Sequence, residues 1–185
     1  MNKPKRRSNT RANPLVLIFI ASGLVILLVS LAFILRPKTN LAIAPPRLGQ
    51  KMSDFQLKDT EEKTVHLSDY AGITVLINTW ATWCPPCRAE MPDLAAFYSA
   101  NQDKNFLILA INAGESSPVA SEFARQLNLK FPVLLDPGYS LMDSLGIDSF
   151  PTSILVGPDG IIKHIQVGMF LPGELEEVVM PFLEK

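Results

Sequence analysis

The chain contains two cysteines, and both lie in the string Trp83-Cys84-Pro85-Pro86-Cys87. The apolar run at residues 73–78 precedes this string and a segment with helical spacing follows it, so we expect the first thiol at a helix N-terminus. The helix dipole and the unpaired N–H groups at that end stabilise a thiolate, which is the nucleophilic form of cysteine. The second thiol lies within the first turn on the same side and is more shielded. The pair is therefore predicted to open and close a small disulfide ring.

Two other interpretations of the cysteine pair stay open. Two cysteines are half of a structural zinc site, but the only histidines, His66 and His164, are near no second ligand motif. A permanent structural disulfide over so short a loop would stabilise the fold little. Pro85 and Pro86 suit the first helical turn, where their missing N–H groups cost nothing. We therefore favour a redox-active pair.

The elements that must position the cysteines are predicted from apolar runs and helical spacing. Strands are expected at residues 73–78, 106–111, 132–135, 152–156 and 161–167, the last two joined by the turn string Gly157-Pro158-Asp159-Gly160. Helices are expected at residues 85–100, 117–127, 139–145, with Gly146 as a cap, and 172–183. Alternation of strands and helices implies parallel pairing, and the terminal hairpin adds an antiparallel part. The expected architecture is α/β, with a mixed central sheet between helices.

An uncharged apolar segment of 21 residues, at positions 15–35, is interrupted only by Ser22, Gly23 and Ser30. A helix of about 20 residues spans the hydrocarbon layer of a bilayer, so this segment predicts a transmembrane anchor. A buried core helix seldom lacks a polar face over such a length. A cleaved signal peptide is the stronger alternative, because Ala42-Ile43-Ala44 fits a cleavage site, but its apolar part is normally shorter. We favour the anchor.

Charge divides the chain into zones. Residues 1–14 carry five basic residues and no acid, and from residue 40 onward 10 Lys and Arg residues accompany all 18 acidic residues. The basic flank predicts an N-terminus in the cytoplasm and a single pass through the cytoplasmic membrane, with the acidic domain outside the cytoplasm. Residues 36–48, which contain three prolines, are expected to form a tether to a domain at residues 49–185. The overall charge balance argues against a nucleic-acid partner.

Residues 80–88, after their strand, resemble the active-site segment of the thioredoxin superfamily. Residues 146–152 resemble the segment that carries a cis-proline facing the cysteines, residues 157–160 the following hairpin turn, and residues 112–116 the loop after the second core strand of ResA-like members. With the predicted anchor, the chain is most similar to the extracytoplasmic TlpA, ResA and CcmG group. The resemblance implies a thioredoxin-like three-layer α/β/α sandwich with a mixed central sheet, preceded by one N-terminal transmembrane helix.

The resemblance also implies roles for individual residues. Cys84 attacks a substrate disulfide, and Cys87 then displaces the substrate from the mixed disulfide. The family implies a cis peptide bond at Pro151, whose backbone would line a groove for an extended substrate; an ordinary strand-entry proline is the alternative. The implied groove consists of Trp83, Pro85, Pro86, Phe150 and Pro151. Trp80 is expected in the core.

Two acidic residues are further candidates. Glu90 follows Cys87 by three positions, which makes their side chains neighbours on one helix face. A carboxylate there can take the proton of Cys87 when the mixed disulfide is resolved, and ResA-like relatives have a functional glutamate at the matching position. Thioredoxins carry a buried aspartate where this chain has Asn78, which accepts no proton, so the task falls to Glu90 unless it is a solvated helix glutamate. For Glu115 we favour a solvated loop acid over a residue at the rim of the site.

These features predict a membrane-anchored, extracytoplasmic thiol-disulfide oxidoreductase that needs no cofactor and no metal, because the two sulfurs carry the electrons. The family implies a monomeric reductant of protein disulfides, such as the Cys-x-x-Cys-His disulfide of apocytochrome c, with an integral membrane electron donor to re-reduce it. Three other functions stay open: an oxidase that introduces disulfides with the same fold, a peroxiredoxin-like peroxidase, and a docking module with vestigial cysteines.

Overall fold

The structure is a computed structural model that describes Phe19, residues 22–28 and residues 45–183. Phe19 and residues 22–28 are helical. Across these described ranges, no helix is long and apolar enough to cross a membrane. The remainder of the predicted anchor at residues 15–35 lies outside the described residues, as do residues 1–14 and most of the predicted tether.

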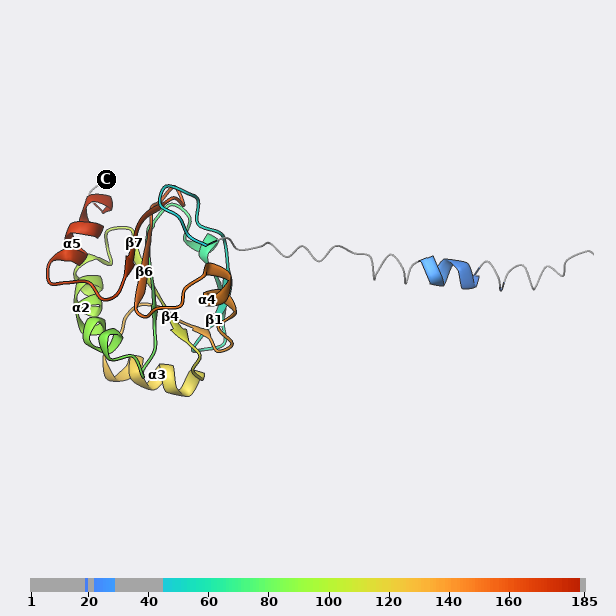
Figure 1. Cartoon of the computed structure of the whole chain (residues 1–185), viewed down its shortest axis with the longest axis horizontal. Helices are drawn as coiled ribbons and strands as arrows, with labels where there is room; N and C mark the ends of the chain where they lie inside the picture. The colour runs from blue at the N-terminus through green and yellow to red at the C-terminus, as the bar shows by residue number, and fades with distance from the viewer. Residues whose placement is uncertain (1–18, 20–21, 29–44, 184–185) are drawn as a thin grey trace, which may run out of the picture. The chain divides into compact units, whose positions relative to one another are not determined.

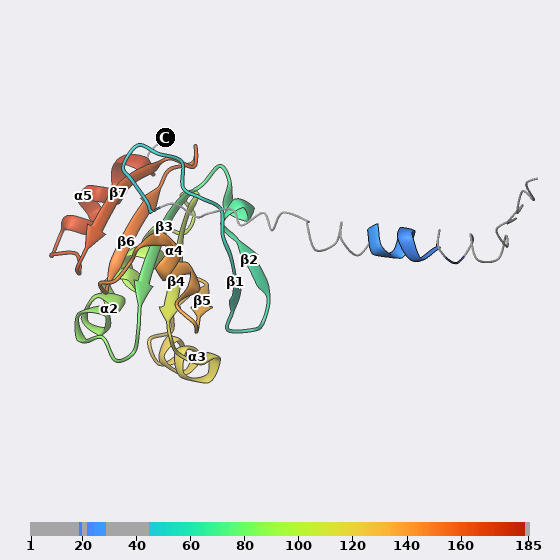
Figure 2. The ribbon, with the colours of Figure 1, turned by 45° about the vertical axis from the view of Figure 1, so that its right-hand side comes forward.

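The second of the two units of the chain, Ala42–Lys185, contains a seven-stranded sheet with the strand order β2-β1-β5-β4-β3-β6-β7. The strands are β1 (Gln56–Asp59), β2 (Thr64–His66), β3 (Thr74–Trp80), β4 (Phe106–Ala113), β5 (Val133–Asp136), β6 (Thr152–Val156) and β7 (Ile162–Val167). β3, β4 and β5 run parallel, whereas β6 and β7 form an antiparallel hairpin beside β3 (Figure 2). The predicted mixed sheet and its terminal hairpin are therefore confirmed.

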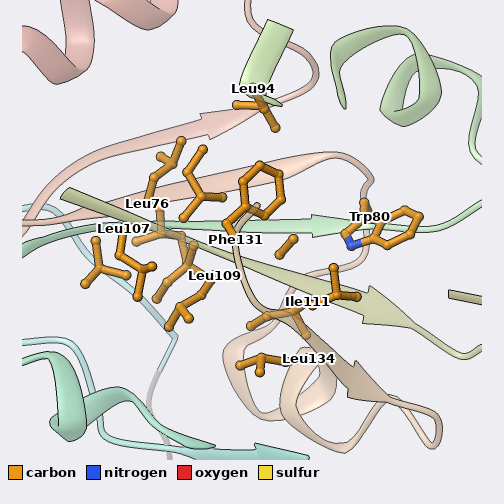
Figure 3. Packing of buried hydrophobic residues seen from close by; sticks show 14 of the residues in the cluster. Leu76, Trp80, Leu94, Leu107, Leu109, Ile111, Phe131 and Leu134 are labelled. Carbon is orange, nitrogen blue, oxygen red and sulfur yellow. The ribbon is translucent and has the colours of Figure 1, made fainter. Parts of the chain in front are cut away.

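The central strands form where the sequence is mostly apolar. Every residue of β3 and of β4 is buried, as expected for strands that are covered on both faces. Figure 3 shows side chains of these strands packed with residues of β5 and α2, among them Leu76, Leu94, Leu109 and Leu134. Each of these four side chains is fully buried. Burial of one such leucine stabilises the fold by about 1.5–3 kcal/mol. The cluster therefore supports the strand and the helix that carry the cysteines.

The helices are α2 (Pro85–Asn101), α3 (Ser117–Gln126), α4 (Ser140–Leu145) and α5 (Glu174–Val179), with short 3-10 turns η1 (Leu67–Tyr70) and η2 (Met180–Phe182). In Figure 1, α2 and α5 lie on one side of the sheet and α4 on the other, which gives the predicted three layers. The predicted cap of α4 is confirmed, because Gly146 ends that helix in the left-handed conformation, with φ of 66°.

Two parts of the fold differ from the prediction. β1, β2 and η1 were not expected, because both strands are short, β2 is the edge strand with β1 beside it, and β1 alternates exposed with partly buried residues. The last helix is shorter than residues 172–183. Gly173 precedes it with φ of 85°, which is not a helical conformation, and Pro181 lacks the N–H that a further α-helical turn requires, so the chain continues as η2.

Candidate active site

The cysteines lie at the junction between the central strand β3 and helix α2. β3 pairs with β4 on one side and with β6 on the other, so its carboxyl end is held from both sides. Residues 81–84 form the linker between β3 and α2. The linker makes a tight turn, because the Cys84 N–H donates to the Ala81 carbonyl at 3.2 Å. Pro85 and Pro86 then occupy the first two positions of α2, as their missing N–H groups predict.

Cys84 is the N-cap residue of α2 and forms a disulfide with Cys87, with an S–S distance of 2.05 Å. The Cys87 N–H donates to the Cys84 sulfur at 3.3 Å. This donor comes from the third helical position, from which an N–H ordinarily reaches the N-cap side chain. Cys84 is 4% exposed and Cys87 is 0% exposed. Cys84 is therefore the sulfur that an incoming disulfide can reach first, which is what its predicted role requires.

The segment beside Trp83 contains a cis peptide bond between Phe150 and Pro151, as predicted. The Thr152 N–H donates to Thr79 Oγ1 at 3.1 Å, and the Thr79 hydroxyl donates to the Thr152 carbonyl at 3.0 Å. These bonds fasten the start of β6 to the end of β3. The Pro151 carbonyl accepts the Gly168 N–H at 2.8 Å, so the cis-proline segment is also tied to the end of β7.

The aromatic residues beside the cysteines divide into one exposed ring and one core ring. Trp83 is 57% exposed, and its ring meets the ring of Phe150 edge-on with the centroids 5.9 Å apart. The structure thus brings together the two aromatic members of the predicted groove. Trp80 is 1% exposed and lies in the core, as predicted. The remaining groove residues are the exposed Pro85 and Pro86 and the buried Pro151.

Glu90 is only 3% exposed, so the solvated alternative for this residue is wrong. Its Oε1 accepts the Phe170 N–H at 2.9 Å, and its Oε2 accepts an N–H of Asn78 Nδ2 at 3.1 Å. Burial raises the pKa of Glu90 above the usual value for glutamate, against the opposing effect of these two hydrogen bonds. α2 buries Cys87 and Glu90 together. Glu90 also lines a cavity of about 720 Å³ between α2 and residues 170–180.

Known proteins are similar in sequence to this chain over most of its length. The model of the AhpC/TSA family matches residues 48–165. The thiol-disulfide oxidoreductase ResA of Halalkalibacterium halodurans is 33% identical over 138 residues, which cover 75% of this chain and 76% of that protein. The ResA of Geobacillus thermodenitrificans is 31% identical over 175 residues, which cover 95% of each chain. The chain belongs to the AhpC/TSA family.

Solved structures place this AhpC/TSA-family chain among thioredoxin-like proteins. A protein assigned as the thiol:disulfide interchange protein DsbE of Chlorobium tepidum superposes with a TM-score of 0.69 at 29% identity, over 75% of this chain and 99% of that chain. The resemblance to ResA-like proteins that the sequence motifs indicated is thereby confirmed. The chain is a thiol-disulfide oxidoreductase. Its Cys84 and Cys87 form a disulfide in the structure.

Glu115 is not the solvated loop acid that the sequence favoured. Its carboxylate accepts the Thr82 N–H at 2.8 Å, the Thr82 hydroxyl, and an N–H of Asn112 Nδ2 at 2.7 Å. The side chain is half-buried, because it lies against the linker that leads to Cys84. Glu115 therefore lies beside the residues that lead to Cys84, which agrees better with the less favoured alternative, a residue at the rim of the active site.

Sequence reasoning also missed residues that support the acidic groups. Ser153 accepts a second N–H of Asn78 Nδ2 at 2.9 Å, and Asn112 holds Glu115 from β4. Phe170 contributes only its backbone N–H, for which a side-chain pattern carries no signal. Polar residues inside otherwise apolar strands were the available signal for Asn112 and Ser153, because a buried amide or hydroxyl needs a hydrogen-bond partner.

Proposed function

We propose that this oxidoreductase is a protein disulfide reductase, anchored in the membrane with its catalytic domain outside the cytoplasm. The observation that supports the reducing direction is the set of donors around Cys84. The N–H groups of the second and third helical positions are those that reach an N-cap side chain. Here Pro86 fills the second position and has no N–H, so the Cys87 N–H, at 3.3 Å, is left to stabilise a Cys84 thiolate.

A missing donor makes the reduced form of the pair less stable. A hydrogen bond to a charged group contributes about 1.5–3 kcal/mol. For a two-electron couple about 1.4 kcal/mol corresponds to 30 mV, so the absent donor lowers the reduction potential by about 30–60 mV. A pair with a lower potential gives up its electrons more readily, which favours reduction of a substrate disulfide over its formation.

The experiment that tests the direction measures the reduction potential of the full-length chain in thiol buffers, with tryptophan fluorescence as the signal. We expect a value near or below about −250 mV, in the range of thioredoxin. Pro86→Ala restores the N–H at the second position and should raise the potential by about 30–60 mV. Pro92→Ala, an exposed proline inside the same helix, is the matched control and should leave the potential unchanged.

Each outcome separates one part of the proposal from another. A wild-type potential near about −120 mV is that of a strong oxidant and would support the disulfide-introducing oxidase instead. A low potential that Pro86→Ala does not move would leave the direction intact and refute the donor argument. Rapid consumption of peroxide by the chain would support the peroxidase alternative.

The proposed anchor rests on the sequence. Residues 15–35 are long enough and apolar enough to span a bilayer, and the basic residues 1–14 favour retention of the N-terminus in the cytoplasm. Residues 36–48 would then form the tether and residues 49–185 the catalytic domain. A reporter enzyme that is active only outside the cytoplasm, fused after Lys185, should be active. Activity of a cytoplasm-only reporter at that position would refute the topology.

The proposed substrates are protein disulfides, such as that of apocytochrome c, and the proposed electron donor is an integral membrane protein. Both follow from the resemblance to the TlpA, ResA and CcmG group. In the reaction, Cys84 attacks the substrate disulfide and releases one thiol, and Cys87 attacks the mixed disulfide and releases the other. Two electrons pass to the substrate and the Cys84–Cys87 disulfide forms. Loss of c-type cytochromes in a deletion strain, restored by the wild type and not by Cys84→Ser, is the expected result.

A further inference from the structure

The linker between β3 and α2 is held by a carboxylate that belongs to a different strand connection. Thr82, two residues before Cys84, donates both its N–H and its hydroxyl to Glu115. The bond from the Thr82 N–H to Glu115 Oε2 measures 2.8 Å, and Asn112 Nδ2 donates to the same oxygen at 2.7 Å. One carboxylate therefore joins the linker that carries Cys84 to the end of β4.

The position of Glu115 is itself fixed from two sides. β4 ends at Ala113, and Gly114 reverses the chain with φ of 75°. The Gly114 N–H donates to the Asp136 carbonyl at 3.0 Å. The Tyr139 ring packs against Gly114 from the other side. A Cβ on Gly114 would lie 2.1 Å from the Tyr139 hydroxyl oxygen. The acceptor that Thr82 meets is thus held in place by the ends of β4 and β5.

In the described residues the other backbone hydrogen bonds of the linker are local, and its ring contact with a distant segment joins Trp83 to Phe150. The Cys84 N–H bonds within the linker to the Ala81 carbonyl, and Pro85 and Pro86 have no N–H to donate. Trp83, between Thr82 and Cys84, is 57% exposed. Hydrogen bonds from Thr82 to Glu115 connect the linker to the end of β4.

We propose that Glu115 is a positioning residue for Cys84: through Thr82 it holds the linker, and with it the Cys84 sulfur, in place for disulfide exchange. The inference rests on the exchange reaction of the Cys84–Cys87 pair described above. Attack on a disulfide requires the sulfur to approach along a defined line, and a shift of about 1 Å in a reacting group can cost a factor of about 100 in rate. Glu115 touches neither sulfur in this arrangement and acts by placing one of them.

Two substitutions at this position separate hydrogen bonding from charge. In Glu115→Gln, the amide oxygen can accept the Thr82 N–H and the Asn112 N–H, and the amide nitrogen can donate to the Thr82 hydroxyl, which rotates to accept. This variant keeps the three bonds and loses the charge. Glu115→Ala loses both and leaves the Thr82 N–H without its acceptor.

The experiment follows the reaction of the reduced full-length chain, in mild detergent, with the small disulfide DTNB. We expect Glu115→Ala to lower the rate constant of the first step, attack by Cys84, roughly 10-fold or more, and Glu115→Gln to stay within about threefold of the wild type. Glu122→Ala is the matched control, because Glu122 also accepts three side-chain hydrogen bonds, all from its own helix α3. It should not change the rate.

A purely structural role gives a different pattern. In that case Glu115→Ala would lower the free energy of unfolding in urea, and the folded variant would still react at the wild-type rate, which would overturn the inference. A rate loss in Glu115→Gln as large as in Glu115→Ala would also overturn it, because charge rather than position would be responsible. A wild-type chain that did not react with DTNB at all would refute the proposed function together with this inference, whereas failure to reduce apocytochrome c alone would affect only the proposed substrate.

Discussion

Glu90→Gln tests whether Glu90 takes the proton of Cys87 during resolution of the mixed disulfide. The two residues are three positions apart on α2, and both are buried, with Glu90 at 3% and Cys87 at 0% exposure. Burial raises the pKa of Glu90, so the carboxyl keeps its proton to a higher pH than a solvated glutamate does. Replacement of the carboxylate by an amide of the same shape removes the proton acceptor and leaves the site otherwise filled.

The surroundings of Glu90 accommodate the amide. Its oxygen can accept the Phe170 N–H in place of Oε1, which leaves the amide N–H₂ facing Asn78. If the Asn78 amide turns over, its oxygen can accept from this N–H₂ and from the Ser153 hydroxyl. In the described part of the chain, Asn78 Oδ1 has no partner before this rearrangement. The number of hydrogen bonds is conserved, but the Asn78 N–H₂ then occupies the buried position where Oδ1 had no partner, so we expect the free energy of unfolding at neutral pH to fall by about 1–3 kcal/mol.

The expected kinetic effect falls on the second step of the exchange. A positioned general base accelerates proton transfer by about 10²–10⁴-fold. Glu90→Gln should therefore slow the attack by Cys87 on the mixed disulfide by about 100-fold at a pH above the pKa of Glu90. Below that pKa the wild-type carboxyl is protonated and accepts no proton. The wild-type rate should then fall toward the rate of the variant as the pH is lowered.

The assay is rapid mixing of the reduced chain with DTNB at a series of pH values. The first release of thionitrobenzoate reports attack by Cys84, and the second reports resolution by Cys87. Glu90→Gln should slow the second phase, and the first phase is an internal control. Glu177→Gln, an exposed glutamate on α5, should change neither. Equal second phases in wild type and Glu90→Gln, or a constant ratio of their rates at every pH, would refute the assignment of Glu90 as the base.

Three further predictions concern stability, measured by urea unfolding. Burial raises the pKa of Glu90 in the folded chain. The stabilisation that its neutral form contributes is therefore present at low pH and is lost as the pH rises through the folded pKa. Glu90→Gln should flatten this decline of the free energy of unfolding with pH. Gly114→Ala should cost about 1–3 kcal/mol, because position 114 has φ of 75° and the new Cβ would meet the Tyr139 hydroxyl oxygen at 2.1 Å; an unchanged stability would mean that Tyr139 moves freely aside. Leu109→Ala, at 0% exposure, should cost about 2–5 kcal/mol, and Val119→Ala, at 45% exposure, less than about 0.5 kcal/mol; similar costs would contradict the assignment of the core.

The central part of the fold is predictable from sequence because its signal is local and strong. Residues 106–111 are an unbroken apolar run, and residues 73–78 are apolar except for Thr74 and Asn78, a pattern typical of strands buried on both faces. Both strands extend two residues beyond these runs, to Trp80 and to Ala113. The extensions include Thr79 and Asn112, polar residues that pattern reasoning assigns to loops. Hydrogen bonds hold the Thr79 hydroxyl and the Asn112 amide nitrogen in place, so the pattern ends before the strand does.

In the active site, too, contacts between residues close in sequence are predictable and contacts between distant residues are not. The cysteines are adjacent in sequence to the strand and the helix that place them, and the spacing of Glu90 from Cys87 sets their shared helix face. Thr82 and Glu115 are 33 residues apart in the chain. Their contact depends on a reversal at Gly114 and on the pairing of Trp80 with Asn112. Neither is encoded near Thr82, so sequence reasoning had no means to join the two residues.

Asn78 explains why the buried acid of this site lies on α2 and not on β3. Asn78 Nδ2 donates to Glu90 Oε2 at 3.1 Å, so an aspartate at position 78 would place a second carboxylate in contact with the first. Two carboxylates that close cannot both ionise in a buried site, and the pair would share one proton over a wide range of pH. The shared proton would leave Glu90 unable to accept another near neutral pH. An amide at position 78 avoids this conflict and donates a hydrogen bond to the ionised carboxylate, which keeps Glu90 available as an acceptor for the proton of Cys87.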